Sequence, residues 1–403
     1  MMARPDARIL TLNGGSSSIK IAVFEAGNSL RRILTGEIER IGSPDAILRI
    51  AGPNGANSAL RQLSAPDHAV AMSALLDVIV ERVGSGALTA TGHRLVHGGP
   101  GYSQPQQMSA EMLQDLQKVS AFDPEHLPAE ILMAEAVRQR FPTLPQVACF
   151  DTAFHSDLPR VARVLPIPRR YDAQGVRRYG FHGLSYEFLM GELSRKEGGG
   201  RVQGRVILAH LGNGASLAAV LDGRPMDTSM AFTPCAGVPM GTRSGDLDPG
   251  VLWYLARTEG LDARQLNEML TFQSGLLGVS ERSSDMRELL AHEAQDVRAA
   301  EAIALFCYQV RKCIGAYAAV LGGLDTLVFA GGIGENAPAV RERICAELGF
   351  LGIELNRERN TTNAPLISSD AGRVRVRVIR TDEELMIARS VMRVLGLGAG
   401  QGD

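Results

Sequence analysis

Three glycine-rich polar loops carry residues suited to chemistry, and each follows a short apolar run of β-type residues. The pairs of run and loop are Arg8–Asn13 with Gly14–Ser18, Arg205–Leu211 with Gly212–Ser216, and Thr326–Ala330 with Gly331–Asn336. Glycines let backbone N–H groups converge on an anion, and side-chain hydroxyls add further donors. Lys20 adds a positive charge just after the first loop. A single loop of this kind would read as a hairpin turn, but the repetition predicts a phosphate-binding protein.

Two arginines lie among glycines. Arg94 stands in the segment GHRLVHGG (92–99), and Arg243 stands in MGTRSGDLDPG (240–250). A guanidinium flanked by glycine is suited to hold a carboxylate or a phosphoryl oxygen through two N–H groups. The alternative for Arg94 is a solvated side chain at a strand end. Asp248, in the second segment, is better explained as a helix N-cap than as a catalytic acid.

Three further polar residues are candidates for a site. Asp151 follows the apolar run Val147–Phe150, which places it at the carboxyl end of a strand, where open α/β sheets bind ligands. His182 lies between glycines at the start of a helix, where it would be exposed to a ligand, although a lone histidine is usually structural. Asp285, in SSDMR (283–287), reads mainly as a helix start.

Composition bounds the class of protein. The chain has 403 residues, of which 45% are hydrophobic and 21% charged, and its formal net charge is −2. This mix predicts a soluble protein of two domains with no nucleic acid or anionic membrane as partner. The five cysteines are scattered without a metal-binding spacing, which predicts reduced thiols. Because no signal-peptide pattern is present and charges interrupt the longest apolar stretch, Ala299–Leu324, we expect a cytoplasmic protein.

The residues after each loop indicate the local fold. Ile19–Phe24 and Leu217–Leu221 read as strands, so the first two loops close hairpins, whereas a Walker A loop precedes a helix. Ala337–Leu348 reads as a helix capped by Asn336. Further helices are expected over residues 67–83, 109–119, 129–140, 248–258, 262–270 and 296–320. Two similar strand–loop–strand units about half a chain apart predict a duplicated domain.

The last part of the chain has two clear patterns. Arg373–Ile379 alternates strictly, which is typical of an exposed or edge strand. Thr381–Glu384 has the pattern of a capping box that opens a helix. Asn28–Ser29, Gly198–Gly200 and the segment from Gly396 onward read as flexible surface or tail.

Together these motifs resemble the acetate kinase (acetokinase) family, within the acetate and sugar kinase/Hsp70/actin superfamily. The resemblance covers about residues 8–392 and rests on LNGGSSSIK (12–20), GHRLVHGG (92–99), FDTAFH (150–155), YGFHG (179–183), HLGNGAS (210–216), MGTRSGDLDPG (240–250), SSDMR (283–287), AGGIGEN (330–336) and TDEEL (381–385). It implies duplicated ribonuclease-H-like (actin-like ATPase) α/β domains with an interdomain active-site cleft. The expected N-terminal domain is 1–152 joined by a C-terminal helix at about 383–403, and 153–382 would carry most of the ATP site.

The resemblance also implies a reaction and a set of roles. The family transfers the γ-phosphate of ATP reversibly to acetate, giving acetyl phosphate and ADP, with Mg²⁺ (or Mn²⁺), as a homodimer. Asp151, His182 and Arg243 would be catalytic, Arg94 would bind the substrate, and Asn13 and Glu383 would hold the metal. The residues implied to bind ATP are Lys20, His210, Leu211, Gly212, Asn213, Gly214, Asp285, Met286, Arg287, Gly332, Ile333, Gly334, Glu335 and Asn336.

Physical chemistry refines two of these roles. A carboxylic acid with a pKa near ~4 to 5 is already ionised at neutral pH, so the acceptor has no proton for Asp151 to remove. We therefore expect Asp151 to act through Mg²⁺ or by orienting Arg94 and His182. In a capping box, Glu384 would be engaged with the backbone of Thr381. That leaves Glu383 for the metal.

The chain departs from the family pattern at two places. Asp123–Pro128 stands where the family usually reads Ala-Pro-Leu-His-Asn-Pro, which puts Glu125 at the apolar position beside the acetate methyl. Leu184–Tyr186 stands where Thr-Ser-His is more familiar. Glu125 would either pair with a cation such as His126, or face water and leave a wider pocket. Propionate or another short acid is therefore an alternative acceptor.

Two other functions of the superfamily compete with this interpretation. A sugar or polyol kinase must deprotonate a hydroxyl, and Asp151 would then be the base. The pair Arg94 and Arg243 favours an anionic acceptor instead. A non-enzymatic ATP switch would need a peptide-binding domain or polymerising inserts, for which the kinase motifs leave little room.

Overall fold

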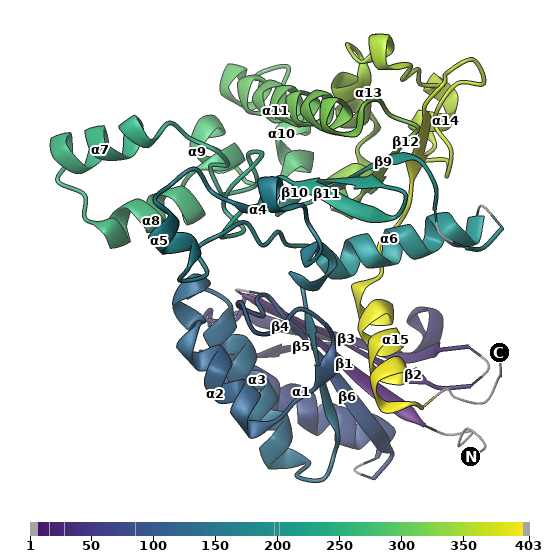
Figure 1. Ribbon diagram of the computed structural model, residues 1–403. Helices are drawn as coiled ribbons and strands as arrows, with labels where there is room; N and C mark the ends of the chain where they lie inside the picture. The colour runs from purple at the N-terminus through teal and green to yellow at the C-terminus, as the bar shows by residue number, and fades with distance from the viewer. Residues whose placement is uncertain are drawn as a thin grey trace. The chain divides into compact units, whose positions relative to one another are not determined.

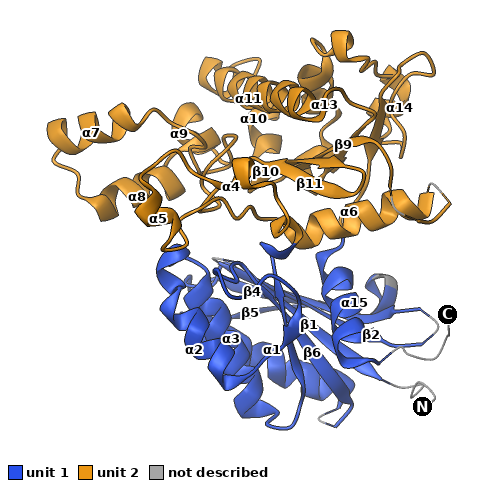
Figure 2. Cartoon of the chain, viewed as in Figure 1, with its two compact units in different colours: residues 1–153, 382–403 blue, residues 154–381 orange. Residues whose placement is uncertain are grey.

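The protein forms two compact units in a computed structural model that describes residues 7–15, 17–27, 29–84, 86–196, 198–200 and 202–397. Unit 1 comprises residues 1–153 and 382–403, and unit 2 comprises residues 154–381 (Figure 2). The chain therefore leaves unit 1, forms unit 2 as one continuous stretch, and returns to unit 1. Ser16 of the expected first loop, and Asn28 and 398–403 of the expected flexible segments, lie outside the described residues.

Unit 1 is built on an eight-stranded mixed sheet. Its strands are β1 (Arg8–Gly14), β2 (Ser18–Glu25), β3 (Arg31–Glu39), β4 (Ala46–Ala51), β5 (Ala59–Leu63), β6 (Leu88–Leu95), β7 (Gln106–Gln107) and β8 (Gln146–Phe150). They lie in the order β5-β4-β3-β2-β1-β6-β8-β7. β1 and β2 form the predicted first hairpin, in which Asn13 lies opposite Lys20. β6 runs parallel to both β1 and β8.

Unit 2 contains a five-stranded sheet. Its strands are β9 (Arg205–Leu211), β10 (Ala215–Leu221), β11 (Arg224–Thr228), β12 (Thr326–Ala330) and β13 (Arg375–Val378). They lie in the order β11-β10-β9-β12-β13. β9 and β10 form the predicted second hairpin, and β12 runs parallel to both β9 and β13. The alternating segment near the C-terminus is therefore an edge strand, as predicted.

The two sheets share one topology. The order β3-β2-β1-β6-β8 in unit 1 corresponds to the order β11-β10-β9-β12-β13 in unit 2. In both, three antiparallel strands are followed by two parallel ones. The predicted duplicated ribonuclease-H-like α/β fold is thus confirmed. β4, β5 and β7 extend the first copy; these three strands, like β3 and β11, were not predicted from the sequence.

Helices cover both faces of the sheet in unit 1 (Figure 1). They are α1 (His68–Val83), α2 (Ala110–Lys118), α3 (Leu127–Arg140) and α15 (Glu383–Leu395). α1 and α3 pack on the sheet face that carries Leu10, Leu12 and Ile21. α15 packs over β1 and β6, and Gly92 permits this approach, because a Cβ there would lie 2.5 Å from the side chain of Ile387.

Unit 2 contains the remaining helices. They are α4 (Arg160–Arg163), α5 (Arg169–Asp172), α6 (Gly183–Lys196), α7 (Pro249–Thr258), α8 (Ala263–Phe272), α9 (Gly275–Ser280), α10 (Met286–His292), α11 (Val297–Leu321), α12 (Gly331–Asn336), α13 (Pro338–Cys345) and α14 (Arg357–Thr361). Figure 1 shows α11 on one side of the sheet and α6 on the other. Six of the predicted helices begin and end within two residues of the observed bounds, whereas the helix predicted over 337–348 ends at Cys345. The cysteines are free thiols.

The third glycine-rich segment is a short helix, α12, and not the predicted loop. The carbonyl groups of Gly334 and Glu335 accept hydrogen bonds from the buried Arg341 guanidinium, at 2.8 and 3.1 Å. The carbonyl groups at the end of a helix have no partner within the helix. Here the Arg341 side chain supplies hydrogen-bond donors for two of them. Asn336 donates to the carbonyl of Gly332 and does not cap α13, contrary to the prediction.

The predicted capping box at the last helix is wrong. The N-cap of α15 is Asp382, whose carboxylate accepts the backbone N–H of Leu385 at 3.0 Å. Aspartate is as good an N-cap as threonine and lies one residue further along the chain. Glu384 is therefore not held by Thr381, and the argument that assigned the metal to Glu383 by elimination fails.

No helix within the described ranges combines the length and the apolar character that crossing a membrane requires.

A buried histidine makes the stability of unit 1 depend on pH. His93, in β6, is 1% exposed, and burial lowers its pKa to about 4 despite its hydrogen bond to Gln146. In the unfolded chain a histidine titrates near ~6.5. Below that pH the unfolded state gains a proton that the folded state does not take up, so the free energy of unfolding falls.

We expect the wild type to lose about 2 kcal/mol more stability than His93→Gln when the pH is lowered from 7 to 5. Urea unfolding of both proteins at the two pH values measures this difference. Glutamine is the control because it keeps a polar group at the position but cannot take up a proton. An equal loss in both proteins would show that His93 is not the titrating group.

Candidate active site

A largely buried arginine connects Asp151 with Glu130 and the first glycine-rich loop. Arg94, at the end of β6, donates from Nη2 and Nε to Oδ2 of Asp151 at 2.8 and 3.3 Å. Its Nη1 donates to the carbonyl of Gly14 and to Oε1 of Glu130, both at 2.9 Å. The other Glu130 oxygen accepts the backbone N–H of Val96 at 2.7 Å. Arg94 therefore keeps one of its five N–H groups for a ligand, and the expected two-pronged contact would require one of these bonds to break.

Charge compensation sets the ionisation of this group. Burial opposes the charge of Arg94, but Asp151 and Glu130 outweigh that effect and raise the pKa of Arg94. Burial raises the pKa of Glu130, although Arg94 and the Val96 N–H oppose the shift. Both Glu130 oxygens accept N–H groups, and such a pair of bonds is that of an ionised carboxylate.

The two predicted metal ligands are in contact with each other. Asn13 Nδ2 donates to Oε2 of Glu383 at 2.9 Å, so a direct contact supports the choice of Glu383 that the capping argument no longer does. Burial and the charge of Asp151 raise the pKa of Glu383. Lys20, opposite Asn13, has a side chain that is 55% exposed and lies 3.8 Å from Glu37.

This set of donors fits Mg²⁺. Carboxylate and amide oxygens are the ligands of this hard cation, which takes one or two carboxylates and otherwise keeps water and phosphate oxygens. A divalent cation beside Glu383 would offset the repulsion from Asp151 that raises its pKa. Among the described residues, no group of three or more His, Cys, Asp or Glu side chains is placed to hold a metal by itself.

The segment that departs from the family pattern turns Glu125 toward solvent. Glu125 is exposed. His126 Nδ1 lies 2.9 Å from Oδ1 of Asp123, which is 3% exposed. A buried carboxylate needs a partner more than an exposed one does, which accounts for this contact.

Two histidines and an arginine meet at the second glycine-rich loop, in unit 2. The rings of His182 and His210 stack with centroids 4.2 Å apart and planes at 23°. A Cβ on Gly214 would lie 3.3 Å from Nε2 of His182 and 3.6 Å from Nη1 of Arg243, so both side chains approach one point of the loop. His182 has a φ of 58°, a left-handed conformation that is rare for a residue with a Cβ and concentrates at functional sites.

A cavity of about 630 Å³ adjoins the same loop. This volume is typical of a small-ligand site. The lining residues are Gly212, Asn213, Ser284, Asp285, Met286, Arg287, Leu290, Gly332, Ile333, Asn336, Ala337, Pro338 and Ala339. Asp285 is also the N-cap of α10, so its predicted helix-start role holds as well. Most of the residues predicted to bind ATP are thus brought to one cavity.

The remaining predicted ATP residues do not line this cavity. Leu211 and Gly334 are buried. Glu335 Oε1 accepts the backbone N–H groups of Gly331 at 3.0 Å and of Thr381 at 3.1 Å, so it positions the start of α12. The apolar lining residues, Leu290 and Ala337–Ala339, were not predicted, because an apolar side chain gives no chemical signal in the sequence. The polar Ser284 also lines the cavity and was not predicted.

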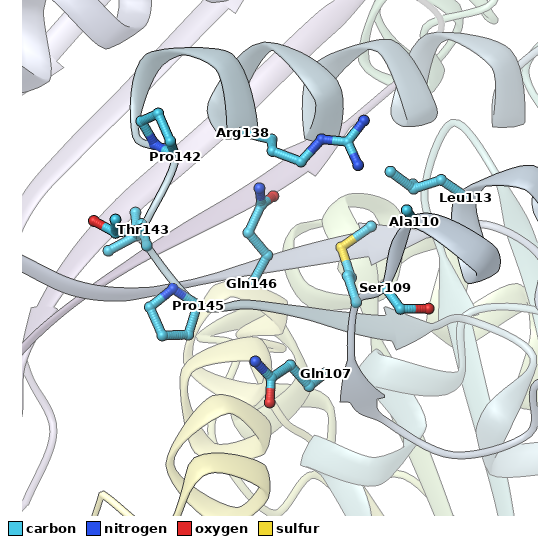
Figure 3. A pocket seen from close by; sticks show the side chains of 11 residues that line it. Gln107, Ser109, Ala110, Leu113, Arg138, Pro142, Thr143, Pro145 and Gln146 are labelled. Atoms are coloured by element: carbon cyan, nitrogen blue, oxygen red, sulfur yellow. The ribbon is translucent and has the colours of Figure 1, made fainter.

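A smaller cavity, of about 240 Å³, lies in unit 1 (Figure 3). It is bounded by the side chains of Gln107 and Leu113, of Arg138 near the end of α3, and of Gln146 at the start of β8. None of the predicted site residues lines it.

Glu130 is the charged site residue that was not predicted from the sequence. It lies in the first turn of the helix predicted over 129–140, where an acidic residue is favourable on any helix. It also lies at the spacing i, i+4, i+7 with Ala134 and Val137, which face the core. A carboxylate on the buried face of a helix requires a cationic partner. The position of Glu130 on that face could therefore have indicated a buried ion pair.

The chain is similar to known proteins over nearly its whole length. The acetokinase family matches residues 8–389. An acetate kinase of Methylocella silvestris is 43% identical over 96% of this chain and 98% of its own. A propionate kinase of Citrobacter rodentium is 42% identical over 96% of both chains. The crystal structure of Porphyromonas gingivalis acetate kinase aligns with a TM-score of 0.87 at 37% identity, covering 96% of this chain and 100% of that one. A propionate kinase from Francisella tularensis aligns with a TM-score of 0.89 at 36% identity, covering 95% and 98%.

The duplicated α/β fold and its two groups of polar residues thus define a phosphotransferase. The chain belongs to the acetokinase family. It is a kinase that acts on a carboxylate and a nucleotide, with a carboxyl group as the phosphoryl acceptor.

The contact between Glu130 and Arg94 predicts a catalytic effect of Glu130→Gln. One side-chain atom would become an NH₂ group facing either Arg94 or the Val96 N–H, and two donors cannot bond each other. Arg94 would move, and misplacement by about 1 Å costs on the order of 10²-fold in rate. We expect kcat/KM for the carboxylate to fall by about that factor.

Steady-state kinetics and thermal melting of the variant test this expectation. Val137→Ala is the matched control, because Val137 is buried on the same helix and lies in the hydrophobic core. It should lower the melting temperature and leave kcat/KM nearly unchanged. If Glu130→Gln behaved like this control, Glu130 would be important only for stability.

Proposed function

We propose that this protein transfers the γ-phosphoryl group of ATP reversibly to acetate, giving acetyl phosphate and ADP. An acetate oxygen attacks the γ-phosphorus while the bond to the β-phosphate oxygen breaks, and no proton needs to move. The observation that carries the proposal is the arrangement around Arg94, which keeps one N–H group for an anion while it bonds Asp151, Glu130 and the carbonyl of Gly14. By family resemblance we also propose a cytoplasmic homodimer.

The cavity beside the second loop is the proposed ATP site. Its volume suits a nucleotide, and it joins the loop at Gly212 with α10 and the segment α12–α13. Backbone N–H groups in glycine-rich segments are suited to phosphate oxygens. Asp285 and Arg287 form an ion pair at 2.6 Å, and the Arg287 side chain is 90% exposed. Arg287 is thus able to turn toward an anion at small cost, since exposed ion pairs are weak.

Asp151 acts in this proposal as a positioning residue and not as a base. Its Oδ2 accepts two N–H groups of Arg94. Protonating Asp151 would remove the negative charge that compensates Arg94, which is unfavourable. Asp151 is therefore poorly suited to accept a proton. This argues against the sugar kinase alternative, since a hydroxyl acceptor needs a base. Arg243 and His182 are proposed to face the phosphoryl group as charge spreads over its oxygens.

Asn13 and Glu383 are proposed to hold Mg²⁺. When bound, the metal supplies positive charge that screens the phosphates and orients them. The hydrogen bond from Asn13 fixes the carboxylate of Glu383. Lys20 lies on the neighbouring strand and lowers the cost of ionising Glu383.

Propionate is the second candidate acceptor. The relatives named for acetate and for propionate are about equally similar to this chain. Glu125 faces water, so it neither repels the acceptor from inside nor provides the apolar wall that the family has at this position. One methylene is worth about 1 to 3 kcal/mol of discrimination in a fitted pocket. Without that wall the preference for acetate should be small.

A coupled ADP assay across acetate, propionate, butyrate and glycerol tests the function. We expect turnover of acetate and propionate with kcat/KM values within about tenfold of each other. Glu125→Leu should shift the ratio toward acetate. Turnover of glycerol with none of the acids would contradict the proposed function.

The metal assignment predicts different effects of two adjacent substitutions. Glu383→Gln should raise the Mg²⁺ concentration needed for half-maximal activity by about tenfold or more, because a ligand charge is lost. Glu384→Gln is the control, since Glu384 is similarly half-buried and lies next in the chain. Titrating Mg²⁺ in the activity assay separates them. Equal shifts in both variants, or a larger shift in the control, would refute the assignment.

A further inference from the structure

Each of the two stacked histidines of unit 2 is held at Nδ1 by a serine. Nδ1 of His182 lies 2.8 Å from Oγ of Ser216. Nδ1 of His210 lies 2.8 Å from Oγ of Ser185. The serines thus occupy the same edge of both rings. Nε2 of His182 remains on the opposite edge, beside Gly214.

A buried tyrosine extends the first of these contacts. The hydroxyl of Tyr186, on α6, is hydrogen-bonded to Oγ of Ser216, and both side chains are fully buried. The Tyr186 ring packs against His155 with centroids 5.6 Å apart and against Phe154 at 5.7 Å. Because the ring is held on these sides, its hydroxyl is fixed on Ser216.

The acidity of the groups gives this chain of hydrogen bonds a direction. A phenol, with a pKa near ~10, is a far better donor and a poorer acceptor than an aliphatic hydroxyl. Tyr186 therefore donates to Ser216, and Ser216 in turn donates to Nδ1 of His182. A neutral imidazole that accepts at Nδ1 carries its proton on Nε2.

We infer that Tyr186 and Ser216 are positioning residues that fix His182 as the Nε2–H tautomer. His182 then presents an N–H group beside Arg243, where negative charge develops on the phosphoryl group. Protonated His182 would place a second positive charge beside Arg243, so the neutral form is the one whose tautomer matters. This inference rests on the proposed role of His182.

Tyr186→Phe tests the inference because it removes only one oxygen atom. We expect kcat to fall by about tenfold, less than the 10²- to 10³-fold cost of removing a transition-state donor outright, with KM values for both substrates nearly unchanged. Tyr179→Phe is the matched control: Tyr179 is also buried in unit 2, and its hydroxyl donates to the carbonyl of Gly175 at 2.9 Å. The control should keep wild-type kcat.

A double-mutant cycle with Ser216→Ala provides the second measurement. If the two hydroxyls act in series, the double variant loses no more kcat than Ser216→Ala alone. If the losses of kcat in the two single variants add in the double variant, the two hydroxyls act independently and the inference fails. If kcat falls in step with the melting temperature while KM rises by the same factor, the hydroxyls only stabilise the fold. Wild-type kcat in Tyr186→Phe would overturn the inference directly.

The tautomer is measured by NMR of ¹⁵N-histidine-labelled protein, with the His182 signals assigned by their loss in His182→Gln. The wild type should show Nε2–H, and Tyr186→Phe should populate Nδ1–H. A wild-type Nδ1–H form, or no change in the variant, would overturn the inference. The NMR measurement needs no carboxylate substrate, so its result does not depend on the activity assay. If the wild type failed to phosphorylate acetate, the proposed function would be refuted, whereas the tautomer of His182 could still be measured.

Discussion

One largely buried guanidinium holds three elements of unit 1 together. Arg94, at the end of β6, bonds the carbonyl of Gly14 in β1, Asp151 after β8, and Glu130 on α3. Buried carboxylates cost several kcal/mol each unless they are paired. Without Arg94, Asp151 and Glu130 would be left uncompensated at one end of the sheet. The site residues of this unit therefore share one electrostatic balance, and a change at any of them is felt by the others.

In unit 2 the polar side chains are held mainly by neutral groups. His182 and His210 are fixed by serine hydroxyl groups and by stacking on each other. Arg243 makes long contacts to the carbonyl of Pro234 at 3.4 Å and to the sulfur of Met240 at 3.9 Å. The one unit thus concentrates carboxylates, which suit a cation, and the other presents donors, which suit phosphate oxygens.

Local sequence patterns predicted the elements that depend on local forces. The two hairpins, the edge strand and the N-cap Asp248 follow from residue type and spacing alone, and the structure contains them. The errors had two causes. Asp382 takes the place of Thr381 as the N-cap of α15, and Arg341 supports α12 from seven residues away, so here the deciding residues were neighbours and the local pattern allowed more than one structure. Glu130, in contrast, gained its role from Arg94, 36 residues away in the chain. Pairing across that distance leaves no trace in a window of neighbouring residues.

The return of the chain to unit 1 has a consequence for synthesis on the ribosome. Ile387, on α15, covers the sheet face that Gly92 leaves open. Unit 2 is continuous and can complete its core while translation proceeds, whereas unit 1 waits for its last helix with one apolar face bare. During that interval the first sheet is the aggregation-prone part of the nascent chain. Glu383 arrives with the same helix, so a chain released early would lack both the cover and the carboxylate beside Asn13.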